Sequence, residues 1–238
     1  VAMNALANLL PLFGRATGEV SDSYPSLFTP APFTFGVWGV IYLALAGFVI
    51  FQATRAGRTE PKLDALRPLF VLSCLLNVGW LLAWHGMQIP ISEVVMVALL
   101  LALIAIYRAA GAWRGQEGGA FTWLVHVPFS LYLGWISVAT IANTSIFLLD
   151  IGFDGGSAAV ALTVAVIAVA AVLGIVGVAR RRDAAFALVI AWGLTGVAAA
   201  RADESTLLLT VAAVGAVLLL IAAVWAAFDR SRGRALRA

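Results

Sequence analysis

Charged residues are scarce in this chain of 238 residues: 11% are Asp, Glu, Lys or Arg, whereas 63% are hydrophobic. Soluble domains contain about 25% charged and about 45–50% apolar residues. The deficit excludes a soluble enzyme, a nucleic-acid-binding protein and a disordered chain. Cysteine is nearly absent too, since Cys74 stands alone, which excludes a disulfide framework and a metal site built from several thiolates. What remains is a polytopic membrane protein.

Seven charge-poor runs predict membrane-crossing helices. They lack the alternation of β-strands, and unpaired backbone groups in lipid cost several kcal/mol each, so helices are expected. The apolar stub at residues 1–12 is too short to cross alone and predicts the end of a truncated first helix; a cleaved signal peptide is the alternative. The fold class is therefore an all-α integral membrane bundle of about eight transmembrane helices. The seven runs cover residues 33–53, 69–84, 94–107, 120–149, 158–179, 184–200 and 205–228.

Basic residues are distributed unequally between the two sets of connections. Two of them, Arg15 and Arg201, lie in alternate connections, and the other thirteen lie in the opposite set or in the C-terminal tail. By the positive-inside rule, both termini are expected to be cytoplasmic and residues 14–32 to face outward. The thirteen are Arg55, Arg58, Lys62, Arg67, Arg108, Arg114, Arg180, Arg181, Arg182, Arg230, Arg232, Arg234 and Arg237.

Acidic residues are missing from the middle of the predicted helices. All twelve Asp and Glu residues fall in connections or at helix ends. Proton pumps and ion-coupled transporters place ionisable groups inside the membrane, so this pattern disfavours them. The two histidines, His85 and His126, are expected roughly 20 Å apart along the membrane normal and cannot share one iron. We expect no metal site and no catalytic residue.

Three segments combine aromatic, amide and small side chains at helical spacing. In each segment these residues share one helix face, since residues three, four and seven apart lie together. Buried indole and phenol groups need hydrogen-bond partners, and small residues leave room for a flat ligand or for close helix contact. The alternative is that the aromatics form interface belts and the amides join helices. The stripes are Phe35, Trp38 and Tyr42; Asn77, Trp80 and Trp84; and Tyr132, Trp135, Ala139 and Asn143.

These segments resemble the TspO/MBR family of tryptophan-rich sensory and translocator proteins. The family pattern of prolines, Phe and W-x-x-[LI]-Y is similar to the segment from Pro30 to Tyr42. Its L-N-x-x-W motif is similar to that of Leu76, Asn77 and Trp80, and its Y-x-x-W-x-x-x-A-x-x-x-N motif to the third stripe. The resemblance covers residues 1–149. It implies an enlarged bacterial form, in the cytoplasmic (inner) membrane, with a five-helix core at residues 1–149 and a three-helix extension with a basic tail at 150–238.

The resemblance also implies a function. Members are described as binding flat hydrophobic ligands, so a membrane sensor that binds a porphyrin, haem or another tetrapyrrole without covalent attachment is expected. Some members are described as promoting light-dependent porphyrin breakdown, and relatives form homodimers. By this resemblance Trp135 would stack on the macrocycle. The expected ligand-binding residues are Trp38, Tyr42, Asn77, Trp80, Trp84, Tyr132, Trp135, Ala139 and Asn143.

Two other functions remain open from the sequence. The last three predicted helices are rich in small residues such as Gly174, Gly193 and Gly215, which would suit an accessory subunit docked on a larger membrane complex. The absence of charge inside the membrane is also compatible with passive transport of a lipid-like or isoprenoid molecule. Transporters often contain interrupted helices, and Pro128 is the one hint of an interruption.

Overall fold

The computed structural model describes residues 12–111 and 119–235, and these residues form helices and connections without any β-strand. The prediction of an all-α membrane bundle is confirmed. Within these ranges six helical spans are long and apolar enough to cross a membrane, and α9 is a shorter apolar helix. The apolar helices are α3 (Val37–Ala53), α5 (Lys62–His85), α6 (Ile89–Ala109), α7 (Val127–Asp150), α8 (Ala159–Arg181), α9 (Ala184–Ala200) and α10 (Thr206–Ala235).

Each of the seven predicted runs overlaps one of these helices. The bounds of α9 agree with the predicted run, whereas α5 begins seven residues before its run. The stub predicted at residues 1–12 lies outside the described residues except for Leu12, and so do Arg114 and Arg237.

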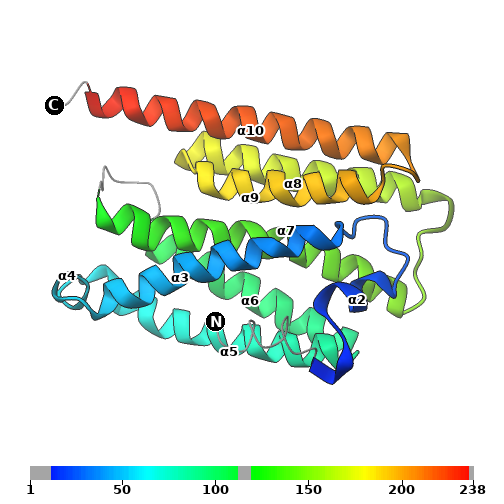
Figure 1. Ribbon diagram of the computed structural model, residues 1–238, viewed down its shortest axis with the longest axis horizontal. Coiled ribbons are helices and arrows are strands. Elements are labelled where there is room, and N and C mark those ends of the chain that lie inside the picture. The colour runs from blue at the N-terminus through cyan, green and yellow to red at the C-terminus, as the bar shows by residue number, and fades with distance from the viewer. Residues whose placement is uncertain (1–11, 112–118, 236–238) are drawn as a thin grey trace.

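Short elements mark the two ends of the bundle. Helix α2 (Thr17–Asp22) and the 3₁₀ turn η2 (Pro32–Gly36) lie at one end, here called the loop end. Helix α4 (Arg55–Arg58) lies at the opposite end, here called the basic end, toward which the last turns of α10 also point (Figure 1). Consecutive long helices therefore run in opposite directions between these two ends.

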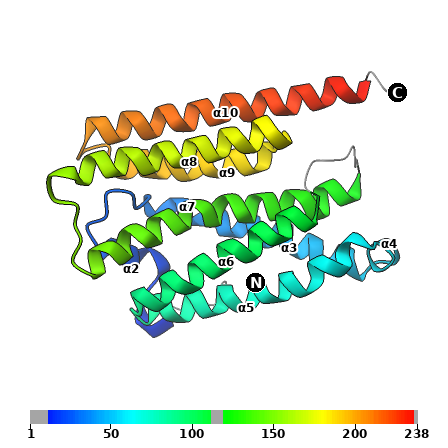
Figure 2. The ribbon, with the colours of Figure 1, turned by 180° about the vertical axis from the view of Figure 1, so that it is seen from behind.

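The long helices are arranged in layers. Helices α8, α9 and α10 lie side by side, and α7 lies between them and the α5–α6 pair (Figures 1 and 2). Glycines allow the close approach: a Cβ atom added at Gly193 would lie 2.8 Å from Val138 of α7, and one added at Gly174 would lie 2.4 Å from Leu219 of α10. The small residues of the last three helices thus serve packing within this chain.

Helix α7 is preceded without a break by a π-helical turn, η3 (Thr122–His126). Pro128, at the start of α7, has no N–H to donate to a preceding carbonyl, which favours a locally wider turn. The helix stays continuous to Asp150, so Pro128 does not interrupt it as an unwound transporter helix would be interrupted.

A buried carboxylate joins α9 to the helices beneath it at the basic end. Asp183 is 0% exposed and caps α9 by accepting a hydrogen bond from the backbone N–H of Phe186 at 3.0 Å. Its Oδ2 also accepts from the hydroxyls of Tyr107 in α6, at 2.7 Å, and Ser130 in α7, at 2.6 Å. One side chain therefore fixes the positions of three helices relative to one another.

Candidate functional site

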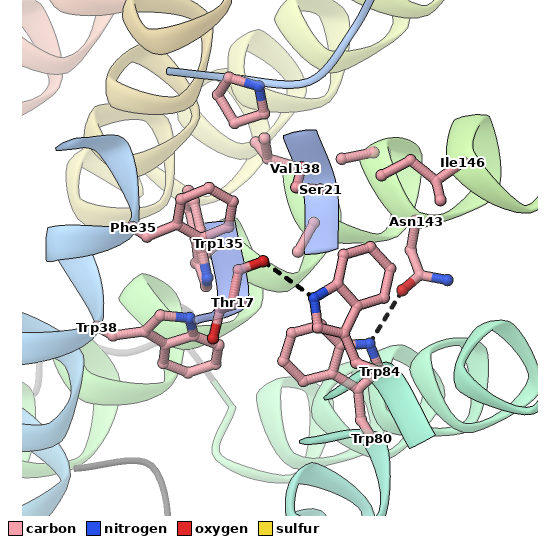
Figure 3. Close-up of a pocket in the computed structure, with 13 residues that line it drawn as sticks. Thr17, Ser21, Phe35, Trp38, Trp80, Trp84, Trp135, Val138, Asn143 and Ile146 are labelled. Carbon is pink, nitrogen blue, oxygen red and sulfur yellow. Dashed lines mark hydrogen bonds between the residues drawn. The ribbon is translucent and has the colours of Figure 1, made fainter. Parts of the chain in front are cut away.

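Four tryptophans from three helices surround one cavity near the loop end of the bundle. Trp38 comes from α3, Trp80 and Trp84 from α5, and Trp135 from α7. The cavity measures about 30 Å³, room for about two water molecules. Its full lining is Thr17, Ser21, Pro30, Phe35, Trp38, Trp80, Trp84, Trp135, Val138, Ala139, Ala142, Asn143 and Ile146 (Figure 3).

The four indoles are almost completely buried, with between 1% and 5% of each residue exposed. Trp80 and Trp84 stack at 5.6 Å between ring centroids, and Trp135 meets the rings of Phe35 and Trp38 edge-on at 5.8 and 6.2 Å. Such offset and edge-on arrangements are the favoured geometries of aromatic pairs. The rings fill most of the space between the helices, so the cavity is small in this structure.

The indole N–H groups differ in how they are satisfied. Trp80 donates to the side-chain oxygen of Asn143 at 3.0 Å, and Trp84 donates to the backbone carbonyl of Thr17 at 3.1 Å (Figure 3). The N–H of Trp135 is buried and has no hydrogen-bond partner. A buried donor without an acceptor costs about 1–3 kcal/mol, and such exceptions in native structures occur at functional sites among other places.

Six of the nine residues predicted to bind ligand line this cavity: Trp38, Trp80, Trp84, Trp135, Ala139 and Asn143. The other three lie behind the ring of Trp38. Tyr42 stacks on Trp38 at 5.1 Å, Tyr132 meets it edge-on at 5.7 Å, and a side-chain hydrogen bond joins Tyr132 to Asn77. Their contacts position Trp38 and do not reach the cavity itself.

An acidic side chain reaches this site, although none was expected near the stripes. Glu93 accepts hydrogen bonds from the side chains of Asn143 and Thr144, both at 2.7 Å. The helix α6 begins five residues earlier than its predicted run, which places Glu93 inside the helix instead of in a connection. Because Glu93 accepts from the amide nitrogen of Asn143, the amide oxygen is turned toward Trp80.

Helix α2 covers the loop-end side of the cavity with Thr17 and Ser21. Neither residue was predicted from the sequence to belong to the site. His85 is buried; its Nδ1–H donates to the carbonyl of Leu81 at 2.8 Å, and its Nε2 lies 3.3 Å from the hydroxyl of Thr17. Together with the bond from Trp84, this contact holds α2 against the end of α5. This contact could not be predicted from sequence spacing, because Thr17 and His85 are 68 positions apart.

The segment that carries Pro30 into the cavity lining is fastened to α9. The backbone N–H of Ala31 donates to the carbonyl of Gly196 at 3.0 Å, and the indole of Trp192 donates to the carbonyl of Thr34 at 2.8 Å. Phe33 also meets Trp192 edge-on at 5.5 Å. The indole of Trp192 therefore braces one wall of the cavity.

Comparison with known proteins places this chain in a family. The family model described as TSPO-like protein matches residues 1–225. The chain belongs to this family. The matched residues include most of α10. The family match therefore extends beyond residues 1–149, the range that the sequence resemblance covered.

Two curated TSPO-like relatives are similar to about half of the chain. The tryptophan-rich protein TspO of Chlorobaculum tepidum is 27% identical over 114 residues, which are 48% of this chain and 67% of the relative. The tryptophan-rich protein TspO of Archaeoglobus fulgidus is 29% identical over 129 residues, 52% of this chain and 74% of the relative. No solved structure matches the chain.

Proposed function

We propose that this membrane protein is a receptor for a flat hydrophobic ligand of the tetrapyrrole class, bound in the tryptophan-lined cavity. The observation that carries the proposal is the convergence of four buried indoles from three helices, one of them with an unpartnered N–H. Indole faces stack on planar rings, and the free N–H of Trp135 can donate to a ligand acceptor. Ala139 and Ala142 leave one side of the cavity free of bulky side chains.

The cavity has to open for such a ligand to enter. At about 30 Å³ it is far below the roughly 300–1,000 Å³ of ordinary ligand pockets. The part that can move is α2, a helix of six residues that the hydrogen bond from Trp84 and the contact with His85 hold to the end of α5. We therefore propose that ligand entry displaces α2 at the loop end.

The lining favours a metal-free porphyrin over haem. None of the thirteen described residues that line the cavity is a His, Cys, Met or Tyr that could bind the iron of haem from its axial side. His85 lies next to Thr17, but both of its ring nitrogens are engaged. If haem does bind, stacking on the indoles would hold it, and the chain would supply no axial ligand from the cavity wall.

The experiment that tests the proposal is a titration of the protein in lipid nanodiscs with protoporphyrin IX. We expect saturable quenching of tryptophan fluorescence, a shift of the porphyrin absorption band and one site per chain. Haem should bind no more tightly and should show no spectrum of axial nitrogen ligation. Quenching that rises linearly without saturation would mean that the porphyrin only dissolves in the lipid, which would contradict the proposal.

Residues 150–238 form an extension whose role in this proposal is to brace the cavity wall. We infer that the core at residues 1–149 holds the ligand and that α9 fixes the segment at residues 30–34. We also propose that the basic end faces the cytoplasm and the loop end faces outward, in a bacterial cytoplasmic membrane, since Arg55, Arg58 and Arg180–Arg182 lie at the basic end.

Replacing Gly196 by alanine tests the bracing. The new Cβ would lie 2.0 Å from the hydroxyl of Thr34 and 2.9 Å from Pro30, so the segment must shift. We expect a loss of about 1–3 kcal/mol in stability, typical of overpacking, together with a changed porphyrin affinity. Thermal unfolding and the nanodisc titration measure both. The matched control is Gly39→Ala, since a Cβ there meets nothing within 4 Å; equal results for the two variants would refute the bracing role.

Replacing Glu93 tests whether the orientation of Asn143 matters. In Glu93→Ala the amide of Asn143 loses the acceptor that turns its oxygen toward Trp80. We expect porphyrin affinity to fall roughly fivefold, the equivalent of one hydrogen bond of about 1 kcal/mol. Glu93→Gln keeps an acceptor oxygen and should restore most of the affinity. A purely structural role would instead lower the unfolding temperature in both variants and leave the affinity of the folded protein unchanged.

A further inference from the structure

A second and larger cleft lies at the loop end and is lined in part by the segment that contains Phe28. It measures about 430 Å³, which is within the range of small-ligand pockets. Its walls are the segment at residues 25–28, the last turns of α7, the connection that follows α7, and the first turns of α8. Figure 2 shows the connection by which the chain passes from the end of α7 to α8 at the loop end, and residues of this connection line the cleft.

Most of the side chains that line the cleft are apolar, among them Phe28, Leu148, Leu162 and Val166. Three hydroxyl side chains, Ser26, Ser145 and Thr163, also line it, and those of Ser145 and Thr163 donate to carbonyls of their own helices. The exposed carboxylate of Asp154 lies in the connection that follows α7 and also lines the cleft. On α8 the lining extends from Ala159 to Val166, which at 1.5 Å per residue is about 10 Å into the membrane from the helix start. A long, mostly apolar slot with a charged residue at its mouth suits an amphiphile, which has an apolar chain and a charged head group.

An apolar opening of this size at membrane depth requires a filling. Protein interiors contain few voids larger than a water molecule, and apolar cavities do not hold ordered water. In a bilayer, the acyl chains of lipids are available to fill such an opening. We propose that this cleft binds one acyl chain of a lipid from the leaflet at the loop end, a lipid whose head group carries an amine.

The charge at the mouth selects the head group. Asp154 uses one oxygen to accept from the backbone N–H of Gly156 at 2.8 Å, and Asp150 accepts from the hydroxyl of Tyr24 at 2.7 Å. Burial and the hydrogen bond to Asp150 raise the pKa of Tyr24 to about 12, so the tyrosine stays neutral. No Lys, Arg or His is among the described residues that line the cleft. An ammonium group is therefore attracted to the mouth and an anionic head group is repelled.

Native mass spectrometry of the protein released from nanodiscs tests the inference. The discs contain equal parts of phosphatidylethanolamine and phosphatidylglycerol with the same acyl chains. We expect one retained phosphatidylethanolamine per chain, favoured about threefold over phosphatidylglycerol, the size expected for one exposed ion pair. Leu162→Trp fills the cleft and should lower retention roughly tenfold, because each buried methylene of the lipid contributes to it.

The matched control is Leu173→Trp on the same helix. Leu173 is 43% exposed against 46% for Leu162, and it does not line the cleft. This variant should retain lipid like the unaltered protein, and Asp154→Asn should keep the lipid but lose the preference for the amine. Equal retention in the two tryptophan variants, or an unchanged preference in Asp154→Asn, would overturn the proposal. Porphyrin binding is a separate property of the other cavity and should be unaffected by Leu162→Trp.

Discussion

Trp135→Ala is expected to lower the affinity of the protein for protoporphyrin IX at least tenfold. Trp135 is 1% exposed, lines the cavity and carries the unpartnered N–H. Removing it takes away one stacking face, worth about 1–3 kcal/mol per ring, and a buried donor that has no partner in the protein. The measurement is the nanodisc titration followed by fluorescence quenching and porphyrin absorption.

The matched control for this variant is Trp123→Ala. Trp123 lies in the π-helical turn that leads into α7, is 69% exposed and does not line the cavity, so its removal should leave the affinity unchanged. Because loss of a buried tryptophan destabilises a core by about 3–5 kcal/mol, Trp135→Phe is measured as well. It retains most of the packing but lacks the N–H, and we expect an intermediate affinity. An unaltered affinity in folded Trp135→Ala protein would rule out the cavity as the porphyrin site.

Asp183→Ala is expected to produce a large loss of stability. The carboxylate accepts three hydrogen bonds, from Tyr107, Ser130 and the backbone of Phe186, in a fully buried position. Hydrogen bonds to a charged group contribute about 1.5–3 kcal/mol each, and they are not additive, so we expect a loss of about 3 kcal/mol or more. For a chain of this size that corresponds to a fall of about 6–12 °C in the unfolding temperature.

Thermal unfolding of the detergent-solubilised protein measures this effect. Asp203→Ala is the control, because Asp203 is exposed in the connection before α10 and a surface change is usually within about 0.5 kcal/mol. Asp183→Asn should lie between the two, since an amide keeps one acceptor oxygen but cannot accept from both sides. If Asp183→Ala unfolds at the same temperature as the control, the carboxylate does not hold α9 to α6 and α7.

The membrane helices could be predicted from the sequence because lipid imposes a strong constraint: every crossing must be apolar and helical. The bounds were less accurate where helices extend past the bilayer. Helix α5 begins at Lys62 because Leu63 and Leu66 are completely buried and Asp64 pairs with Arg67, although this first turn is too charged to appear as an apolar run. Charge scarcity identifies the membrane portion of a helix and not its whole length.

The aromatic part of the site was predictable, and its polar supports were not. Trp38, Trp80 and Trp135 each belong to a different stripe of residues at helical spacing. Because each stripe lies on one face of its helix, the periodicity indicated that the three faces could converge, and all three tryptophans line the cavity. The contacts of Thr17 with His85 and of Glu93 with Asn143 join residues 68 and 50 positions apart. Such pairs cannot be predicted from the spacing of residues along the chain, because they depend on how the helices pack in three dimensions.

We propose above all that the small tryptophan cavity widens to hold a planar ring system. An experimental structure of the protein in nanodiscs with protoporphyrin IX bound tests it most directly. We predict density for the macrocycle in contact with Trp38, Trp80 and Trp135, with α2 displaced from its present contacts with Trp84 and His85. Density for the porphyrin elsewhere, with these rings still packed against one another as in the present structure, would contradict the account.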